Sequence, residues 1–373
     1  MAAAHGDGLW LKLKKNRVAV ASLFYIVLLS VAALTAFLWM PDRSPDANQQ
    51  FPNLNLKSPL YQAKFLKLEN SSTIETPIWQ GLWQGFPSNA KYIEIGRHTV
   101  MPTGLEVHDI RKGRKELYTW EEVLPHMQPV DIQAQFQNGQ TPNLPIINRT
   151  FWLGTDKYGR CVLSRLILGV RLSLAVGFLA VVVSLLIGIV IGLVGGYYGG
   201  WVDRLCLYLI NVTWSIPTLL LVFAIVLALG KGLWVIFLAV GLTMWVDVAR
   251  LVRGQTLKIK AEQFVDAAKS LGFSDTRIML RHILPNLVGP ILVIVSANFA
   301  SAILVEAGLS YLGFGINPPS PSLGNMLNEN YGFALSGYWY LAVAPSLAIM
   351  GLVLALNSLS AGLRDATDVR LQD

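Results

Sequence analysis

Long runs of residues without a charged side chain constrain this chain more than any other feature. Residues 172–202, for example, contain no Asp, Glu, Lys or Arg. A helix that crosses about 30 Å of hydrocarbon needs about 20 mostly apolar residues, so this run is long enough to span a membrane. Charged residues make up only 14% of the 373 residues, whereas soluble domains carry about 25%. The sequence therefore excludes one large soluble domain and predicts a membrane protein with several spans.

Six segments are predicted to span the membrane, so the expected fold is an all-α polytopic membrane protein with six transmembrane helices. The segments are residues 18–40, 172–202, 205–230, 232 to about 250, 283 to about 312, and about 338 to 363. The first is too long for the apolar region of a signal peptide. It also ends at Trp39-Met40-Pro41, which lacks the small residues of a cleavage site, so we expect it to be retained. Pro217 lies inside the third span and is expected to kink it.

The positions of Lys and Arg predict the orientation, because short cytoplasmic loops are enriched in both. Four precede the first span, seven lie between the fourth and fifth spans, and two follow the sixth. Residues 1–17, residues 364–373 and the connection between the fourth and fifth spans are therefore predicted to be cytoplasmic. The net charge of +7 reflects this asymmetry, so no nucleic-acid partner is expected. Four basic residues within 157–171 fall on the opposite side, and we interpret that stretch as an amphipathic helix along the membrane interface.

Residues 41–156 differ in composition from the rest of the chain and are predicted to lie outside the cytoplasm. They contain 11 Lys and Arg against 12 Asp and Glu, together with short alternating runs such as residues 92–95. Residues 105–110 and 117–120 flank a polar stretch with Gly113 at its centre, which predicts a β-hairpin. The segment is either a small extracytoplasmic domain with β-structure or a long ordered loop packed on the membrane part, and the residues do not separate the two.

The connection between the fourth and fifth spans, about residues 254–286, is predicted to form a helical hairpin. Residues 262–271 favour a helix, and Gly272 is a typical C-terminal stop for which we expect a positive φ. Ser274 or Asp275 can cap a second short helix that ends at Pro285-Asn286. Local chemistry alone is satisfied by a plain cytoplasmic loop. The alternative is a rigid lever that docks in a groove of a soluble partner and transmits motion to the two spans.

The hairpin resembles the EAA loop of bacterial ABC-importer permeases. Asp266-Ala267-Ala268, Gly272 and Leu284-Pro285 occupy the positions of that motif, with Asp266 where the generic motif has Glu and His282 where it has Ile. Residues 282–286, His-Ile-Leu-Pro-Asn, are similar to the form found in the peptide and nickel permease family. In this resemblance the residues that couple the permease to an ATPase are Asp266, Ala267, Ala268, Gly272, Ser274, Asp275, Arg277, Arg281, Leu284 and Pro285.

Three further stretches resemble the same family in the same order along the chain. They are residues 153–174, with Cys161 in place of an expected Asp, residues 306–327, with Leu323 in place of an expected Trp, and residues 362–366. The four matches together span about residues 150–370. The family does not account for the length of residues 41–156. The permease core is thus expected to comprise residues 157–363.

The resemblance implies a subunit of an ATP-driven importer in the bacterial cytoplasmic (inner) membrane, with a type I ABC-importer permease-like fold. It implies the C-type permease for oligopeptides, dipeptides or similar solutes such as nickel chelates. The implied partners are a homologous permease subunit, two ABC ATPase subunits that bind the EAA loops, an extracytoplasmic solute-binding protein and membrane lipid. ATP and Mg would be bound by the ATPases, since this chain has no GxxxxGK[ST] sequence, and no cofactor, metal or catalytic residue is expected in it.

Three polar or helix-breaking residues in the spans are candidates for a pathway or gate: Pro217, Asn298 and Glu306. Each has a purely structural alternative, namely packing for Pro217, helix-joining hydrogen bonds for Asn298, and capping or pairing for Glu306. The alternative function is an ion-gradient-driven secondary transporter, which the uncharged span centres and the lack of an evident internal repeat disfavour. A membrane enzyme is also disfavoured, since the sequence contains neither HExxH nor GxSxG.

Overall fold

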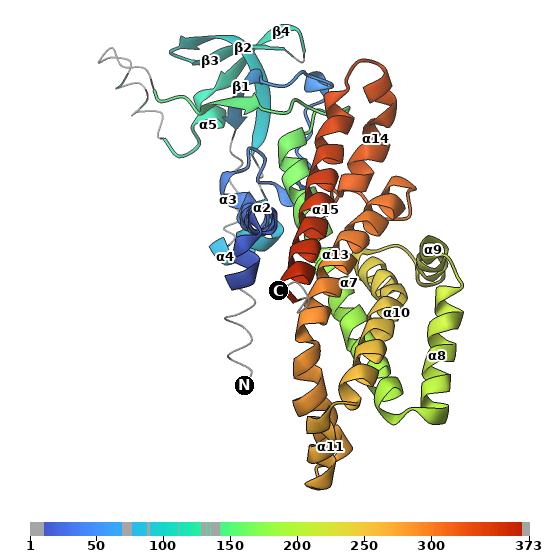
Figure 1. Cartoon of the computed structure of the whole chain (residues 1–373). Coiled ribbons are helices and arrows are strands. Elements are labelled where there is room, and N and C mark those ends of the chain that lie inside the picture. The colour runs from blue at the N-terminus through green and yellow to red at the C-terminus, as the bar shows by residue number, and fades with distance from the viewer. Residues whose placement is uncertain are drawn as a thin grey trace. The chain divides into compact units, whose positions relative to one another are not determined.

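The computed structural model describes residues 11–68, 77–87, 90–110, 112–127, 132, 135 and 142–367. It divides into two compact units. The helical unit contains the chain up to Ala33, Gly169–Glu329 and the chain from Pro345 onward. The sheet unit contains Leu34–Leu168 and Asn330–Ala344. Figure 1 shows the elements of both units along the chain.

Helices form the framework of the helical unit. They are α2 (Arg17–Leu34), α7 (Val162–Tyr198), α8 (Gly200–Trp214), α9 (Thr218–Leu229), α10 (Leu233–Lys260), α11 (Gln263–Ser270), α12 (Asp275–Ile278), α13 (Val288–Tyr311), α14 (Leu323–Leu335) and α15 (Tyr340–Thr367). Within the described residues, five helical stretches are long and apolar enough to cross a membrane, and the number is six if the bent pair α8 and α9 counts as one span. This agrees with the predicted polytopic helical fold.

The third span, predicted for residues 205–230 as one helix kinked at Pro217, is a pair of helices in the structure. Helices α8 and α9 meet at an angle of 85°. Pro217 lies at the break with an extended backbone conformation (ψ 127°), and α9 begins directly after it. Because a proline has no N–H to donate and restricts the residue before it, the chain turns here. The predicted kink at Pro217 is confirmed, and it is much sharper than a bend within one helix (Figure 1).

The predicted interfacial helix in residues 157–171 is wrong. Helix α7 begins at Val162, ten residues before the predicted start of the second span, and runs without a break to Tyr198. Two of its four basic side chains, Arg160 and Arg165, do not lie on an interface, because they are buried beside Asp156. The Nε atoms of Arg160 and Arg165 lie 2.6 and 3.9 Å from Asp156 Oδ2. A buried carboxylate, rather than lipid headgroups, thus pairs with these two guanidinium groups.

Small residues let α7 and α10 approach closely in the helical unit. A Cβ atom added to Gly188 would lie 2.6 Å from Val248 Cβ, and one added to Gly192 would lie 2.6 Å from the carbonyl oxygen of Ala249. Neither distance is compatible with a side chain. Backbones packed this closely gain van der Waals contact, which is the main attraction between helices in lipid. Helices α7 and α10 therefore behave as one rigid pair.

The described part of the sheet unit is built around a five-stranded antiparallel sheet in the order β4-β3-β2-β1-β5. The strands are β1 (Tyr61–Leu68), β2 (Lys91–Met101), β3 (Gly104–Asp109), β4 (Arg114–Thr119) and β5 (Ile146–Phe151). The predicted hairpin is confirmed as β3 and β4, with Leu105 opposite Tyr118. The sheet has its own core, which contains Leu66, Ile95, Leu105, Val107 and Trp120. The segment thus contains the expected β-structure.

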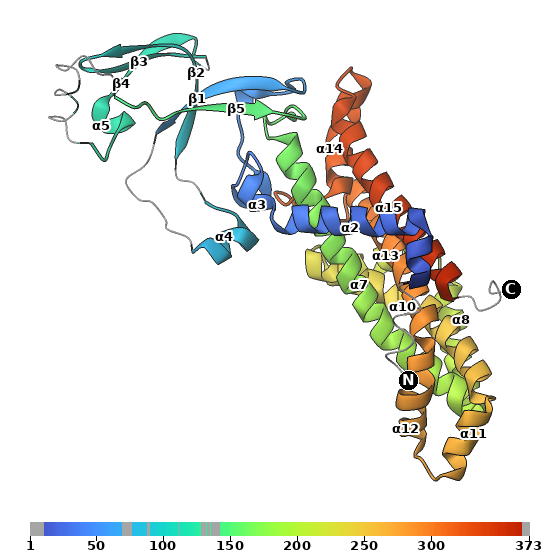
Figure 2. The same ribbon diagram turned by 60° about the vertical axis from the view of Figure 1, so that its left-hand side comes forward.

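Short helical elements complete the described part of the sheet unit. They are α3 (Ala36–Trp39), α4 (Ile78–Gln84) and α5 (Trp120–Val123), with the 3-10 turns η1 (Pro45–Ala47) and η2 (Pro52–Leu54). Helix α5 begins with a capping box: the Thr119 side chain accepts a hydrogen bond from the backbone N–H of Glu122, and the Glu122 side chain accepts one from the backbone N–H of Thr119. Figure 2 shows α3 and α4 next to each other.

Candidate functional site

The connection between α10 and α13 forms the predicted helical hairpin, which we call the coupling hairpin (residues 262–286). Its first arm is α11, and its second arm is α12 followed by a π-helical turn (Met279–Ile283) and a 3-10 turn (Leu284–Leu287). Gly272 joins the arms with φ +76°, as predicted. Ser274 has the extended backbone of an N-cap, but its side chain makes no capping hydrogen bond, so only half of the capping prediction is met.

An apolar core attaches the coupling hairpin to the ends of two long helices. Val265, Ala268, Ile278 and Ile283 are buried on the inner side of the hairpin. They share one core cluster with residues from α7 and α10, namely Leu193, Tyr197, Val248 and Val252. Burial of an aliphatic side chain contributes about 1.5 to 3 kcal/mol. The hairpin is therefore a rigid extension of the α7–α10 pair and cannot swing freely as a loop would.

Polar and aromatic contacts reinforce this attachment. The Tyr197 hydroxyl at the end of α7 donates a hydrogen bond of 2.6 Å to Asp275 Oδ1 at the start of α12. The Phe273 ring, in the turn between the arms, has two neighbours from the second arm. The Arg277 guanidinium lies 4.1 Å from the centroid of the Phe273 ring, and the His282 ring stacks on Phe273 at a centroid distance of 5.7 Å. These contacts hold the second arm against the turn.

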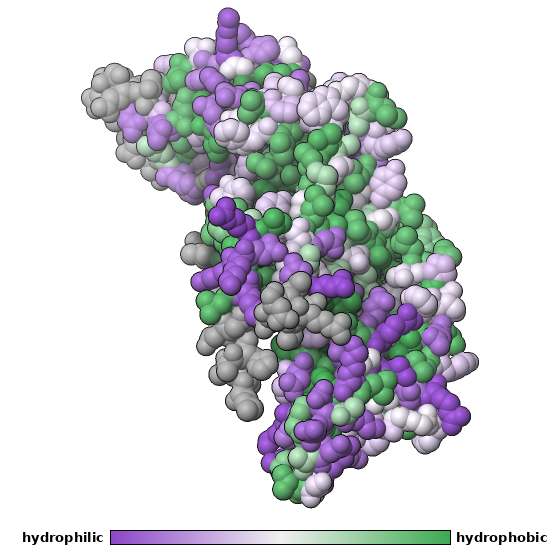
Figure 3. All heavy atoms as spheres, in the orientation of Figure 1, coloured by the Kyte–Doolittle hydropathy of each residue, from purple (hydrophilic) through white to green (hydrophobic). Residues whose placement is uncertain are grey.

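The outer surface of the coupling hairpin is basic and apolar at once. Large exposed apolar side chains occur at Phe264 (44%), Leu271 (72%) and Leu280 (53%). Seven of the predicted coupling residues that have side chains are also exposed: Asp266, Ala267, Ser274, Asp275, Arg277, Arg281 and Pro285. Figure 3 shows hydrophilic residues gathered at the α11 end of the helical unit. A surface of this mixed kind suits a groove on a soluble protein better than lipid, which would leave its charges without partners.

The structure brings most, but not all, of the predicted coupling residues to that surface. Ala268 is buried in the core and Leu284 is half-buried, so both support the hairpin from inside. Asp266 pairs with Lys269 on its own helix, with Oδ1 and Nζ 3.2 Å apart. This exposed pair stabilises α11 only slightly.

The three pathway candidates lie apart from the coupling hairpin and do not form one site. Pro217 is exposed at the α8–α9 bend, and Asn298 is buried in α13 with no hydrogen-bond partner for its Nδ2 atom among the described residues. Glu306, also in α13, is fully buried. It therefore lines no open route in this conformation.

Glu306 is the acceptor of a cluster of serine hydroxyls. Ser173 from α7 donates to Glu306 Oε2 at 2.8 Å, and Ser310 donates to Oε1 at 2.7 Å. Ser322, directly before α14, is a further side-chain partner. Neither Ser173 nor Ser322 was predicted from the sequence as a partner of Glu306, although they lie in the family-like stretches 153–174 and 306–327. The cluster joins α7, α13 and the start of α14, so the capping or pairing alternative fits Glu306 better than a pathway.

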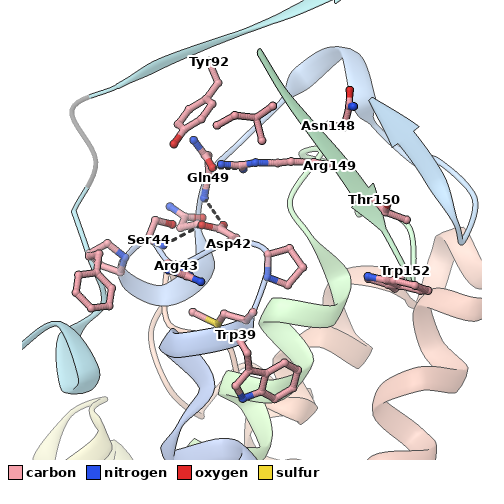
Figure 4. A pocket seen from close by; sticks show the side chains of 16 residues that line it. Trp39, Asp42, Arg43, Ser44, Gln49, Tyr92, Asn148, Arg149, Thr150 and Trp152 are labelled. Carbon is pink, nitrogen blue, oxygen red and sulfur yellow. Dashed lines mark hydrogen bonds between the residues drawn. The ribbon is translucent and has the colours of Figure 1, made fainter. Parts of the chain in front are cut away.

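The sheet unit contains a pocket of about 960 Å³ between residues 39–49 and strand β5 (Figure 4). Arg149 projects into it from β5, donates to Gln49 Oε1 at 2.5 Å and lies 4.4 Å from the centroid of the Tyr92 ring. Asp42 accepts hydrogen bonds from the backbone N–H groups of Ser44 and Gln49 at 2.9 and 3.0 Å. The charged groups are thus already engaged, and they hold the chain after the first span against the sheet.

Comparisons with known proteins place most of the chain in one family. Residues 169–373, more than half of the chain, match the binding-protein-dependent transport system inner membrane component, and residues 7–59 match the N-terminal TM domain of oligopeptide transport permease C. The glutathione transport system permease protein GsiD of Pectobacterium atrosepticum is 35% identical over 307 residues, which cover 82% of this chain and 96% of that protein.

Two further matches are a second GsiD protein and a chain of a solved transporter structure. GsiD of Shigella flexneri is 43% identical over 244 residues, covering 65% of this chain and 80% of that protein. A chain of an inward-facing MetNI methionine ABC transporter is 19% identical, covers 56% of this chain and 97% of its own length, and has a TM-score of 0.45. The family match and the full-length relative agree with the motifs and with the helical fold. This chain therefore belongs to the binding-protein-dependent transport system inner membrane components and is an ABC-importer permease of the oligopeptide/dipeptide family.

Proposed function

We propose that this permease carries peptides or similarly sized peptide-like solutes and that the coupling hairpin receives the motion of two ABC ATPase subunits. The observation that carries the proposal is the attachment of the hairpin, whose inner face shares one apolar core with α7 and α10. A force on the exposed face is then passed to two long membrane helices at once, since a close-packed core transmits strain.

The contact surface consists of the predicted coupling residues together with the exposed apolar side chains of the hairpin. Leu271 and Leu280 would enter a groove on the ATPase, and Arg277 and Arg281 would pair with acidic residues around it. Ala268 and Leu284 act from inside by holding the arms. The Lys and Arg distribution supports a cytoplasmic location for this hairpin and for both termini.

The transport cycle then needs two arrangements of the helices. ATP and Mg are bound by the ATPases, whose closure would push the hairpins together and open the path between this chain and a homologous permease toward the outside. Hydrolysis would reverse the movement. A difference of a few kcal/mol in contact free energy between the two states suffices to switch them. An extracytoplasmic binding protein would deliver the solute.

The solute class is supported by the relatives, which are named as glutathione permeases. Glutathione is a tripeptide, and the match of residues 7–59 to an oligopeptide permease domain is consistent with a peptide-like solute. Selectivity among peptides would rest mainly with the binding protein.

Reconstitution of the whole transporter in proteoliposomes tests this proposal. The chain is combined with the second permease, the ATPases and the binding protein encoded with it, and uptake of labelled glutathione and of a labelled dipeptide is measured. Uptake that requires both ATP and the binding protein is expected. Uptake driven by an ion gradient without the ATPases would overturn the proposal.

A further inference from the structure

Helix α4 of the sheet unit carries an apolar surface that the transport function does not use. Residues 77–87 contain no charged side chain. Trp79 and Trp83 are four positions apart, so they lie on the same face of the helix, and they are 70% and 63% exposed. Indole rings of this size are seldom left in water, because each can bury a large apolar area.

Contacts fix α4 against the residues that directly follow the first span. Phe86, just after α4, packs in one cluster with Ala36, Phe37 and Met40. The backbone N–H of Phe86 donates to the carbonyl oxygen of Arg43 at 2.8 Å. Helix α3, which lies in that cluster, begins only two residues after α2 ends. Helix α4 is therefore held against residues 36–43, which follow α2 in the chain.

The same location has further exposed apolar side chains. Leu38 and Trp39 at the end of α3 are 50% and 49% exposed, and Trp39 lies at the lower edge of the pocket in Figure 4. Both belong to the short helix that α4 packs against. Tryptophan is enriched at the membrane–water interface, because its ring is apolar and its N–H can bond to headgroups or water.

We propose that α4, together with Trp39, is an interfacial anchor that lies in the headgroup region of the bilayer at the end of the first span. Its occupant is the lipid surface, because the segment is continuous with a membrane span, has no charge, and presents tryptophans flanked by the polar but neutral Gln80 and Gln84. The anchor holds the sheet unit at the membrane. This inference goes beyond the proposed function and does not depend on the coupling hairpin.

Site-directed spin labelling tests the anchor in the assembled transporter in lipid nanodiscs. Labels are attached to Trp79→Cys and Trp83→Cys variants, and to Leu117→Cys as a matched control. Leu117 is 53% exposed on strand β4 of the same unit. Both natural cysteines, Cys161 and Cys206, are buried, so the unsubstituted protein gives the labelling background. Collision with oxygen, which concentrates in lipid, is compared with collision with a water-soluble nickel chelate.

The expected result is a several-fold higher ratio of oxygen to nickel collisions at positions 79 and 83 than at position 117. A ratio equal to that at position 117 would overturn the proposal, because the helix would then face water. Protection from both reagents would also overturn it, because the face would then be covered by another protein subunit. Uptake is measured on the same labelled samples, so that a failure of the anchor proposal is distinguished from a failure of the proposed transport function.

Discussion

Substitution of Gly272 is expected to uncouple this permease by distorting the coupling hairpin. Gly272 has φ +76°, and a Cβ atom added there would meet no heavy atom within 4 Å. The cost of a side chain therefore comes from the backbone alone. A non-glycine residue in this conformation costs about 1 to 3 kcal/mol, with β-branched residues at the upper end. Gly272→Val thus lowers the population of the native hairpin by a factor of about 5 to 150.

Two matched variants separate backbone strain from other effects. Asparagine tolerates the left-handed conformation, so Gly272→Asn is expected to stay close to the parent in coupling. Gly254, in the nearby helix α10, has no heavy atom within 4 Å of an added Cβ and does not have a positive φ. Gly254→Ala is therefore expected to be harmless or slightly stabilising, because alanine favours a helix more than glycine does.

The assay is the stimulation of ATPase activity by solute-loaded binding protein in the reconstituted transporter, measured beside uptake and the yield of assembled complex. We expect Gly272→Val to assemble but to lose most of the stimulation. Stimulation at the parent level in Gly272→Val would refute the reasoning. An equal loss in Gly272→Asn would also refute it, because the side chain, and not the backbone, would then be responsible.

Three further outcomes follow from contacts in the structure. Tyr197→Phe removes the hydrogen bond to Asp275 and should weaken the attachment of the coupling hairpin by about 1 kcal/mol. Hydrogen exchange in α12 should then be faster, and unchanged exchange would contradict this role of Tyr197. Glu306→Ala leaves a cavity and unpaired serine hydroxyls and should destabilise the fold by about 3 kcal/mol, whereas Glu306→Gln should cost about 1 kcal/mol, both measured by thermal unfolding. Burial raises the pKa of Glu94 in β2, so the carboxyl group binds its proton more tightly in the folded state than in the unfolded state. The stability of the sheet should therefore fall as the pH rises from the ordinary carboxyl pKa through the raised pKa of Glu94. Glu94→Gln should remove this dependence and slow hydrogen exchange in β2 at neutral pH; an unaltered pH profile would rule it out.

Local features could be predicted from the sequence, and pairings between distant segments could not. Span length and charge depend on neighbouring residues, so five spans and the turn at Gly272 were predictable. The sharp bend between α8 and α9 was underestimated, because a proline indicates a break but not its angle. The neutralisation of Arg160 and Arg165 by Asp156 was missed. Positive charge before a span is typical of a helix at the membrane interface, and the sequence does not reveal that a buried carboxylate lies beside both arginines.

The candidate site shows the same division. The exposed arms of the coupling hairpin follow from helix periodicity and the glycine, but their attachment requires Leu193 and Val248 from two other helices. Glu306 was recognisable as unusual in a span, yet its partner Ser173 lies 133 residues away in the sequence. Contacts at such separation depend on the fold, which a single sequence does not reveal.

Crosslinking in the intact transporter shows whether the coupling hairpin contacts an ATPase subunit on the cytoplasmic side. A cysteine introduced by Leu271→Cys lies at a position that is 72% exposed, whereas the two natural cysteines are buried and should not react. With a short bifunctional reagent, we expect a crosslink to an ATPase subunit whose yield changes when ATP is added. The proposed coupling role is wrong if this variant forms no crosslink to a nucleotide-hydrolysing subunit, or if a membrane-impermeant reagent reaches the introduced cysteine from outside intact cells.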